Sequence, residues 1–270
     1  MYKMTLWHSI VLGFVQGFTE FLPVSSSGHL VLFQKLFGMK EDTSLTLNVF
    51  LHFGTLLAVV MVFWKDLFSV LSQPFGRLSR LLIAGTIPTA IIGITLEDYF
   101  ERLFASGVTI GIEFMITGFV LWLAEADAIG RKRLQETGYI DAAVIGTLQG
   151  AAILPAISRS GLTIVGALFR GLDREFAARF SFLLSVPAIL GATFMESKKL
   201  WEGNAGGFAI GLPEIAGTLV AAISGYIAIR FMVKQIVERS LKLFSLYVWM
   251  VGGLILFDQV FTHKFFPPLF

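Results

Sequence analysis

Long apolar stretches alternate with short polar ones along most of the chain. Six of these stretches are about 20 residues or longer, which is the length that a helix needs to cross a bilayer core of about 30 Å. They predict six membrane-spanning helices. The predicted spans are roughly residues 43–65, 77–97, 105–124, 174–197, 208–234 and 240–260.

Two further apolar stretches, residues 5–37 and 139–170, are interrupted midway by proline and polar residues. Pro23 and three serines break the first, and Pro155 marks the break in the second. Proline ends a helix and the serines can cap a new one, so each stretch predicts a helix, a break and a helix. Backbone that leaves a helix at membrane depth must be buried in protein or line a wet cavity. We therefore expect two re-entrant hairpins whose breaks face one shared polar pocket.

The two interrupted stretches also resemble each other, with matching residues about 133 positions apart. Each half of the chain then holds one hairpin and three spans, and because three is odd, the second half enters the membrane from the opposite side. The sequence thus predicts an all-α polytopic membrane protein, a single membrane domain with inverted repeats at about 1–130 and 131–270. In transporters, such repeats place an anion site near the midplane. The matching residues are Gly13, Gln16 and Gly17 with Gly146, Gln149 and Gly150, Leu22-Pro23 with Leu154-Pro155, and Ser27-Gly28 with Ser160-Gly161.

Composition supports the membrane assignment and excludes other classes. Hydrophobic residues make up 55% of the 270 residues and charged residues 15%, with a mean hydropathy of +0.76, too apolar for a soluble domain. A net charge of +2, without a basic run interleaved with aromatic residues, argues against a nucleic-acid partner. The absence of cysteine excludes disulfides, thiolate chemistry and sulfur-ligated metals. The N-terminal apolar segment has no small-residue cleavage site, so we expect it to be retained.

The distribution of lysine and arginine predicts the orientation, because cytoplasmic loops are enriched in these residues. Thirteen of them fall on one side of the predicted spans and seven on the other, which places the first set in the cytoplasm. The acidic loop at 97–102 then lies outside, the first hairpin enters from outside, and the second enters from the cytoplasm. The cytoplasmic set is Lys65, Arg77, Arg80, Arg131, Lys132, Arg133, Arg170, Arg174, Arg179, Arg230, Lys234, Arg239 and Lys242, and the outer set is Lys3, Lys35, Lys40, Arg102, Lys198, Lys199 and Lys264.

Both breaks carry polar chemistry, which is costly in a membrane and therefore indicates function. In the first, Gln16 and Glu20 are four residues apart and share one helical face. In the second, Arg159 lies among hydroxyls at a new helix N-terminus, and its planar guanidinium matches phosphate oxygens. Arg159 could instead pair with Glu20 merely to lock the hairpins together, and both roles can coexist. The full sets are Gln16, Glu20, Ser25, Ser26, Ser27 and His29, and Ser158, Arg159, Ser160 and Thr163.

With these residues, the chain resembles the undecaprenyl-diphosphate phosphatase family of the bacitracin-resistance type. The resemblance covers two signatures, their separation and the hydropathy of essentially the whole chain. The first signature of the family begins with an acid or an amide, and the chain has the amide Gln16 there. In the second signature the chain has Ala156 where the family commonly has glycine. The amide weakens any claim that two carboxylates bind metal here. The signatures are Gln16-Gly-Phe-Thr-Glu20-Phe-Leu-Pro-Val-Ser-Ser-Ser-Gly-His29 and Pro155-Ala-Ile-Ser158-Arg159-Ser160-Gly-Leu-Thr163.

The resemblance implies hydrolysis of the terminal phosphate of a C55 polyprenyl diphosphate, which yields the monophosphate lipid carrier for peptidoglycan precursors. It also implies a divalent cation, Mg²⁺ or Ca²⁺, an active site at the outer face of the bacterial cytoplasmic (inner) membrane, and bacitracin tolerance on overproduction. The expected partners are this lipid and the bilayer, and the sequence leaves a homodimer open. The expected phosphate-binding residues are Gln16, Ser25, Ser27, Ser158, Arg159, Ser160 and Thr163.

One mechanism assigns attack on the terminal phosphorus to Ser26. His29, three residues on, is expected near Ser26 on the same helical face and could move its proton, as could Glu20. Glu20 could alternatively hold the metal, with Gln16 as a neutral oxygen ligand. Arg159 and its neighbouring hydroxyls would neutralise charge on the transferred phosphoryl group. Direct attack by water stays open as an alternative to Ser26.

A transporter or flippase of polyprenyl phosphate or another anion is the alternative function, because an inverted repeat with a midplane anion site would serve it equally. Hydrolysis also needs a nucleophile and a proton shuttle, which Ser26, His29 and Glu20 could provide. A third function, a purely structural membrane scaffold, would not explain why the chain has Glu20 and Arg159 in apolar sequence. His52 and Glu113, each alone in a predicted span, are given structural roles, and Glu113 is expected to have a polar partner.

Overall fold

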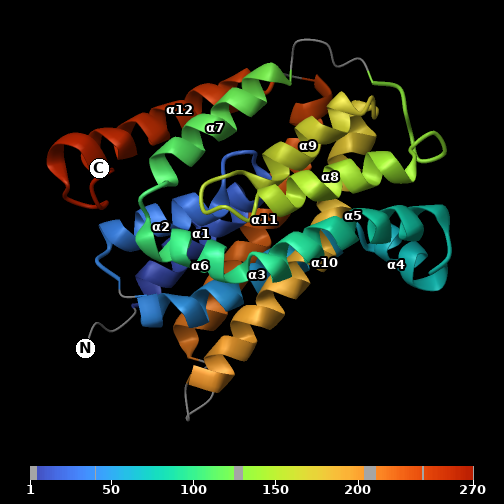
Figure 1. The fold of residues 1–270 in the computed structure, drawn as a ribbon. Coiled ribbons are helices and arrows are strands. Elements are labelled where there is room, and N and C mark those ends of the chain that lie inside the picture. The colour runs from blue at the N-terminus through green and yellow to red at the C-terminus, as the bar shows by residue number, and fades with distance from the viewer. Residues whose placement is uncertain (1–4, 40, 125–129, 204–210, 239, 270) are drawn as a thin grey trace.

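The computed structural model describes residues 5–39, 41–124, 130–203, 211–238 and 240–269, without the side chains of 41–45, 202, 203 and 238. Within these ranges the chain is helical and has no strand, only an isolated bridge between Lys132 and Leu172 (Figure 1). The helices are α1 (Leu6–Phe21), α2 (Ser26–Leu36), α3 (Glu41–Val62), α4 (Trp64–Ser72), α5 (Arg77–Thr95), α6 (Glu97–Ser106), α7 (Ile110–Leu123), α8 (Tyr139–Ala151), α9 (Arg159–Phe169), α10 (Arg174–Gly203), α11 (Leu212–Glu238) and α12 (Lys242–Phe257), followed by the π-helical turn η1 (Asp258–Thr262).

Four to six elements of the described chain can cross a bilayer, which confirms the prediction of a polytopic all-α membrane protein. Helices α5, α10 and α11, and α12 together with η1, are each long and apolar enough alone. Two bent pairs are long and apolar enough when each is taken together, Thr46–Val62 of α3 with α4 at 84° and α6 with α7 at 110°. Predicted positions at Lys3, Lys40, Arg239 and 208–210 lie outside the described residues.

The structure differs from the sequence prediction around the second and third predicted spans. Residues 97–102, expected as a loop, form most of α6, and α7 begins only at Ile110. Helix α6 buries Phe100 and keeps Asp98 and Glu101 exposed, with Glu97 half-buried, so it has an apolar side and a polar side. It ends at Gly107, whose φ of +62° is the left-handed conformation that glycine adopts without a steric penalty.

The two interrupted stretches fold as predicted into a helix, a break and a helix. Helix α1 stops before Pro23, and Ser25 caps α2 by accepting the N–H of Gly28 at 3.2 Å. Helix α8 stops before Pro155, and Ser158 caps α9 by accepting the N–H of Gly161 at 3.1 Å. The same capping bond thus forms in both hairpins, because a hydroxyl precedes each new helix and a glycine follows three residues later.

Close helix crossings hold each hairpin against a spanning helix. A Cβ on Gly13 would lie 2.5 Å from the carbonyl oxygen of Gly217 in α11, and one on Gly146 would lie 1.8 Å from that of Gly85 in α5. Glycine therefore allows the backbones of α1 and α11, and of α8 and α5, to approach where any side chain would separate them. These crossings fix the depth and angle of both hairpins.

Replacing Gly146 by alanine should force α8 away from α5 and lower the free energy of unfolding by about 1–3 kcal/mol. The matched control is Gly191→Ala in α10, where an added Cβ would meet nothing within 4 Å. The measurement is the midpoint of thermal unfolding of the detergent-purified protein. An unchanged midpoint for Gly146→Ala would show that the crossing tolerates a side chain.

Candidate active site

The two breaks meet through hydrogen bonds that run in both directions. Ser27 Oγ donates to the carbonyl oxygen of Pro155, and Ser160 Oγ donates to that of Leu22 at 2.9 Å. Each break thus supplies one hydroxyl and one carbonyl to the other. Exchanged bonds of this kind satisfy backbone groups that lie outside any helix and have no water to bind at membrane depth.

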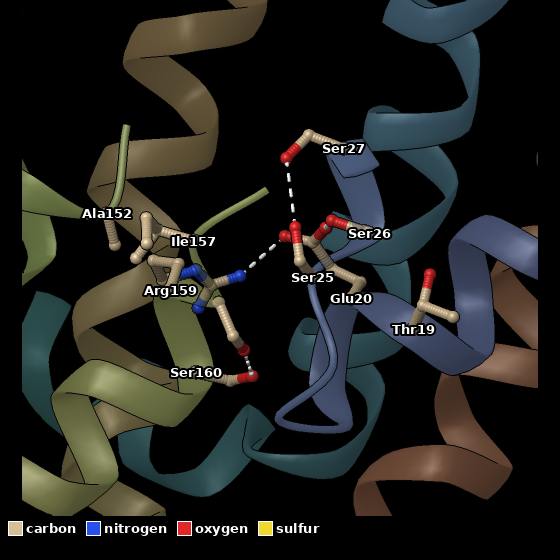
Figure 2. A pocket seen from close by; sticks show the side chains of 10 residues that line it. Thr19, Glu20, Ser25, Ser26, Ser27, Ala152, Ile157, Arg159 and Ser160 are labelled. Carbon is tan, nitrogen blue, oxygen red and sulfur yellow. Dashed lines mark hydrogen bonds and ion pairs between the residues drawn. The ribbon is translucent and has the colours of Figure 1, made fainter. Parts of the chain in front are cut away.

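Glu20 is the centre of the junction and is 7% exposed. Its Oε1 accepts a hydrogen bond from Arg159 Nη2 at 2.5 Å, and its Oε2 accepts from Ser26 Oγ at 2.5 Å and from Gln16 Nε2 at 3.0 Å. Figure 2 shows the guanidinium pointing across the junction at the carboxylate. The Glu20 carboxylate of the first hairpin thus binds the Arg159 guanidinium of the second hairpin and the Ser26 hydroxyl of the first.

A small polar cavity lies between the breaks, so the expected shared pocket exists (Figure 2). Most of the residues that the sequence singled out line it. Its walls are Thr19, Glu20, Ser25, Ser26, Ser27, Ala152, Ile157, Ser158, Arg159 and Ser160.

His29 lies away from this cavity, which corrects the expected pairing with Ser26. Its ring is 2% exposed, with Nδ1 at 2.7 Å from the carbonyl oxygen of Ser25 and Nε2 at 2.8 Å from the hydroxyl of Tyr247. A carbonyl only accepts, so Nδ1 carries the proton and Nε2 accepts from Tyr247. The helical spacing predicted that His29 lies near Ser26 within α2. It could not show that both ring nitrogens of His29 already have hydrogen-bond partners.

Thr163 and Gln16 also lie outside the cavity wall. Thr163 is fully buried, and its hydroxyl lies 2.8 Å from the carbonyl oxygen of Arg159 and 2.6 Å from Ser181 Oγ, so it packs α9 against α10. Gln16 is fully buried behind Glu20. In the described chain Thr163 therefore supports the helix that carries Arg159, and Gln16 supports Glu20.

Two buried polar atoms beside Glu20 have no hydrogen-bond partner, Gln16 Oε1 and Arg159 Nη1. A buried polar group without a partner costs about 1–3 kcal/mol, so these atoms mark places where ligand atoms can bind. The first-turn amides of Arg159 and Ser160 have no acceptor within α9 and add donors beside the guanidinium. The arrangement suits a phosphate.

The donor set can contribute to a cation site but cannot complete one. No group of three or more His, Cys, Asp or Glu that could hold a metal occurs among the described residues. Glu20 supplies one carboxylate, and Gln16 Oε1 is a free amide oxygen beside it. Hard cations such as Mg²⁺ accept these oxygens and take further ligands from phosphate and water.

Other residues near the junction carried no motif signal in the sequence. Glu113 accepts the N–H of Ala156 at 2.7 Å, which is the polar partner expected for it. His52 Nδ1 donates to the carbonyl oxygen of Asn48 and lies 3.9 Å from Glu196 Oε2. Tyr247, the partner of His29, lies more than 200 residues further along the chain, so only the fold could reveal it.

Comparison with known proteins identifies the family of this chain. Residues 9–254 match the family model described as bacitracin resistance protein BacA. The undecaprenyl-diphosphatase of Carboxydothermus hydrogenoformans is 54% identical over 257 residues, which cover 95% of this chain and 98% of the relative. Undecaprenyl-diphosphatase 4 of Bacillus thuringiensis is 47% identical over 262 residues, 97% of this chain and 100% of the relative.

The fold and the site define a multi-pass membrane protein with a buried polar junction between two broken helices. The chain belongs to the bacitracin resistance protein BacA family.

Removing one charge of the buried pair should destabilise the protein more than removing both. Glu20→Ala leaves Arg159, 15% exposed at its side chain, without its counter-charge, and we expect a loss of about 3–5 kcal/mol in the free energy of unfolding. The double variant Glu20→Ala with Arg159→Ala should recover part of this loss without recovering activity. A double-mutant cycle of thermal unfolding measures the coupling.

The control is the more exposed pair Lys199–Glu97, at 2.8 Å, where the same cycle should give about 0–1 kcal/mol. Equal coupling for both pairs would contradict a structural role for the Glu20–Arg159 pair.

Proposed function

We propose that the protein hydrolyses undecaprenyl diphosphate to undecaprenyl phosphate and inorganic phosphate. The observation that carries the proposal is that Glu20 hydrogen-bonds both to Ser26 and to Arg159 of the other hairpin. A hydroxyl bonded to a carboxylate beside a guanidinium provides a nucleophile, a proton acceptor and a phosphate anchor together. The names of the relatives support the same activity.

In the proposed reaction Ser26 Oγ attacks the terminal phosphorus while Glu20 Oε2 takes its proton. The bond from phosphorus to the bridging oxygen breaks, and undecaprenyl phosphate leaves. Glu20 passes this proton to the leaving undecaprenyl phosphate and is then free to take a proton from water, which attacks the phosphoserine. Glu20 returns that proton to Ser26 Oγ as the bond from phosphorus to Oγ breaks and inorganic phosphate leaves. The 2.5 Å contact between Ser26 Oγ and Glu20 Oε2 supports Glu20 as the base in preference to His29.

Arg159 would stabilise the charge that spreads over the transferred phosphoryl oxygens. Its Nη2 is bound to Glu20 while its Nη1 is without a partner, so one arm of the guanidinium remains for the substrate. The hydroxyls of Ser25 and Ser158 and the first-turn amides of α9 would add donors around the same group. The hydroxyls of Ser27 and Ser160, which donate to carbonyls across the junction, would hold the two breaks together beside it. Phosphoryl transfer relies on this kind of positioning and electrostatic stabilisation.

In its alternative role, Glu20 together with Gln16 Oε1 would hold a divalent cation, Mg²⁺ or Ca²⁺. When bound, it would neutralise charge on the diphosphate oxygens. Gln16 is well suited to a supporting part, because its amide already holds the carboxylate at 3.0 Å. His29, bonded to Ser25 and Tyr247, would hold the first break in shape.

We also propose the full architecture of six spans and two re-entrant hairpins in an inverted repeat. Support comes from contacts that recur about 133 residues apart, such as the caps of α2 and α9 and the exchanged serine–carbonyl bonds. The pairing of α1 with α11 corresponds to that of α8 with α5. The lysine and arginine bias orients this arrangement in a bacterial cytoplasmic membrane. The family resemblance implies that the site then opens to the outer side.

A transporter remains the weaker alternative. Its support is architectural, whereas the Ser26–Glu20 contact and the enzyme names of the relatives favour hydrolysis.

The purified protein should release inorganic phosphate from C55 diphosphate with Mg²⁺ or Ca²⁺ and lose this activity in excess chelator. Glu20→Ala, Ser26→Ala and Arg159→Ala should each lower kcat at least a hundredfold, since each removes a group acting on the phosphoryl transfer. Ser72→Ala, at an exposed serine of α4, is the matched control and should match the parent. Retained activity in Ser26→Ala alone would assign the attack to water.

Orientation can be tested by thiol labelling, because the chain contains no cysteine. Ser106→Cys, at the exposed end of α6, should react with a membrane-impermeant maleimide in intact spheroplasts. Ser72→Cys, equally exposed at the end of α4, should react only after the membrane is opened. The reverse pattern would invert the proposed topology.

A further inference from the structure

Helix α7 presents two buried polar side chains to the second break. Glu113 is 4% exposed and Thr117 is fully buried, and they lie four residues apart on one face of the helix. Neither belongs to the two sequence signatures, and neither lines the cavity. A carboxylate at this depth is costly unless it has a specific partner.

Both side chains bind backbone groups of the break. Glu113 Oε2 accepts the N–H of Ala156 at 2.7 Å. Thr117 Oγ1 donates to the carbonyl oxygen of Ala156 at 3.1 Å and accepts the N–H of Ser158 at 3.1 Å. Three hydrogen bonds therefore fix the backbone on both sides of Ile157, where no helix or strand supports it.

The segment held in this way carries the parts of the site that come from the second hairpin. Pro155 offers the carbonyl that binds the Ser27 hydroxyl, Ser158 caps α9, and Arg159 is the first residue of that helix. A shift of this backbone would move the guanidinium relative to Glu20 and loosen the bond between the breaks.

Helix α7 also contacts the first break and is itself firmly held. Phe114 packs so closely on Gly28 that a Cβ there would lie 2.6 Å from the ring. On its other side α7 lies along α12 (Figure 1), where Ser245 Oγ donates to the carbonyl oxygen of Gly118 at 2.5 Å. Helix α7 is therefore held in place by α12, which belongs to neither hairpin.

We propose that Glu113 and Thr117 are positioning residues of the active site, which hold the 155–158 backbone so that Arg159 meets Glu20 and the substrate phosphate. The inference rests on the proposed phosphatase function. In this proposal α7 does not contact the substrate, and it affects catalysis only by fixing the position of Arg159.

The test compares Thr117→Val, which removes both hydrogen bonds at nearly constant shape, with Thr117→Ser, which keeps them. Hydrogen–deuterium exchange of the peptide that contains residues 152–160 is measured on the full-length protein in detergent, together with kcat and KM for phosphate release. In Thr117→Val the Ser158 amide should exchange at least tenfold faster, and kcat should fall about ten- to a hundredfold with little change in KM. Thr117→Ser should restore both values.

A second pair keeps the proposal testable if Thr117→Val folds poorly. Glu113→Gln retains an oxygen that can accept the Ala156 N–H and should behave like the parent, whereas Glu113→Leu should speed exchange of that amide and lower kcat. Parent-like exchange and kcat in both Thr117→Val and Glu113→Leu would overturn the proposal, as would equal losses in Thr117→Ser and Thr117→Val. If the parent itself released no phosphate, the proposed function would fail, while the exchange data would still decide whether α7 holds the break.

Discussion

The pairing of Glu20 with Arg159 is the constraint on which the rest of the site depends. Neither charge is tolerable alone at membrane depth, so each hairpin is complete only when the other supplies the opposite charge. The pair therefore couples assembly of the fold to assembly of the site. The same carboxylate also accepts a hydrogen bond from Ser26, so the group that holds the hairpins together also contacts the residue that we propose as the nucleophile.

Broken helices impose a second requirement, because their free backbone groups need partners that the bilayer cannot provide. The serines of each break satisfy carbonyls of the other, and α7 satisfies the remaining groups around Ala156. Serine is suited to this environment because its hydroxyl both donates and accepts. Hydroxyls that line the cavity thus serve the structure directly, which explains why several occur in the apolar sequence between Gln16 and His29.

The chemistry is divided unequally between two similar hairpins. The glycines at the helix crossings, the capping serines and the prolines recur in both halves of the sequence. The two charged residues do not recur. At the position that corresponds to Glu20 the second hairpin has the apolar Ile153, and at the position that corresponds to Arg159 the first hairpin has Ser26. Two similar hairpins can thus place one carboxylate and one guanidinium face to face, because each hairpin needs to carry only one of the two charges.

The sequence by itself determined the helical membrane class, the two breaks and the residues that gather at them, because apolar length, proline and hydroxyl caps act locally. Only the tertiary structure decided which of these residues meet. His29 hydrogen-bonds to Tyr247 rather than to Ser26, and Thr163 packs against α10. Glu113 and Thr117 hydrogen-bond to the backbone of the second break. Those outcomes depend on partners distant along the chain, and helical spacing describes neighbours within one element only.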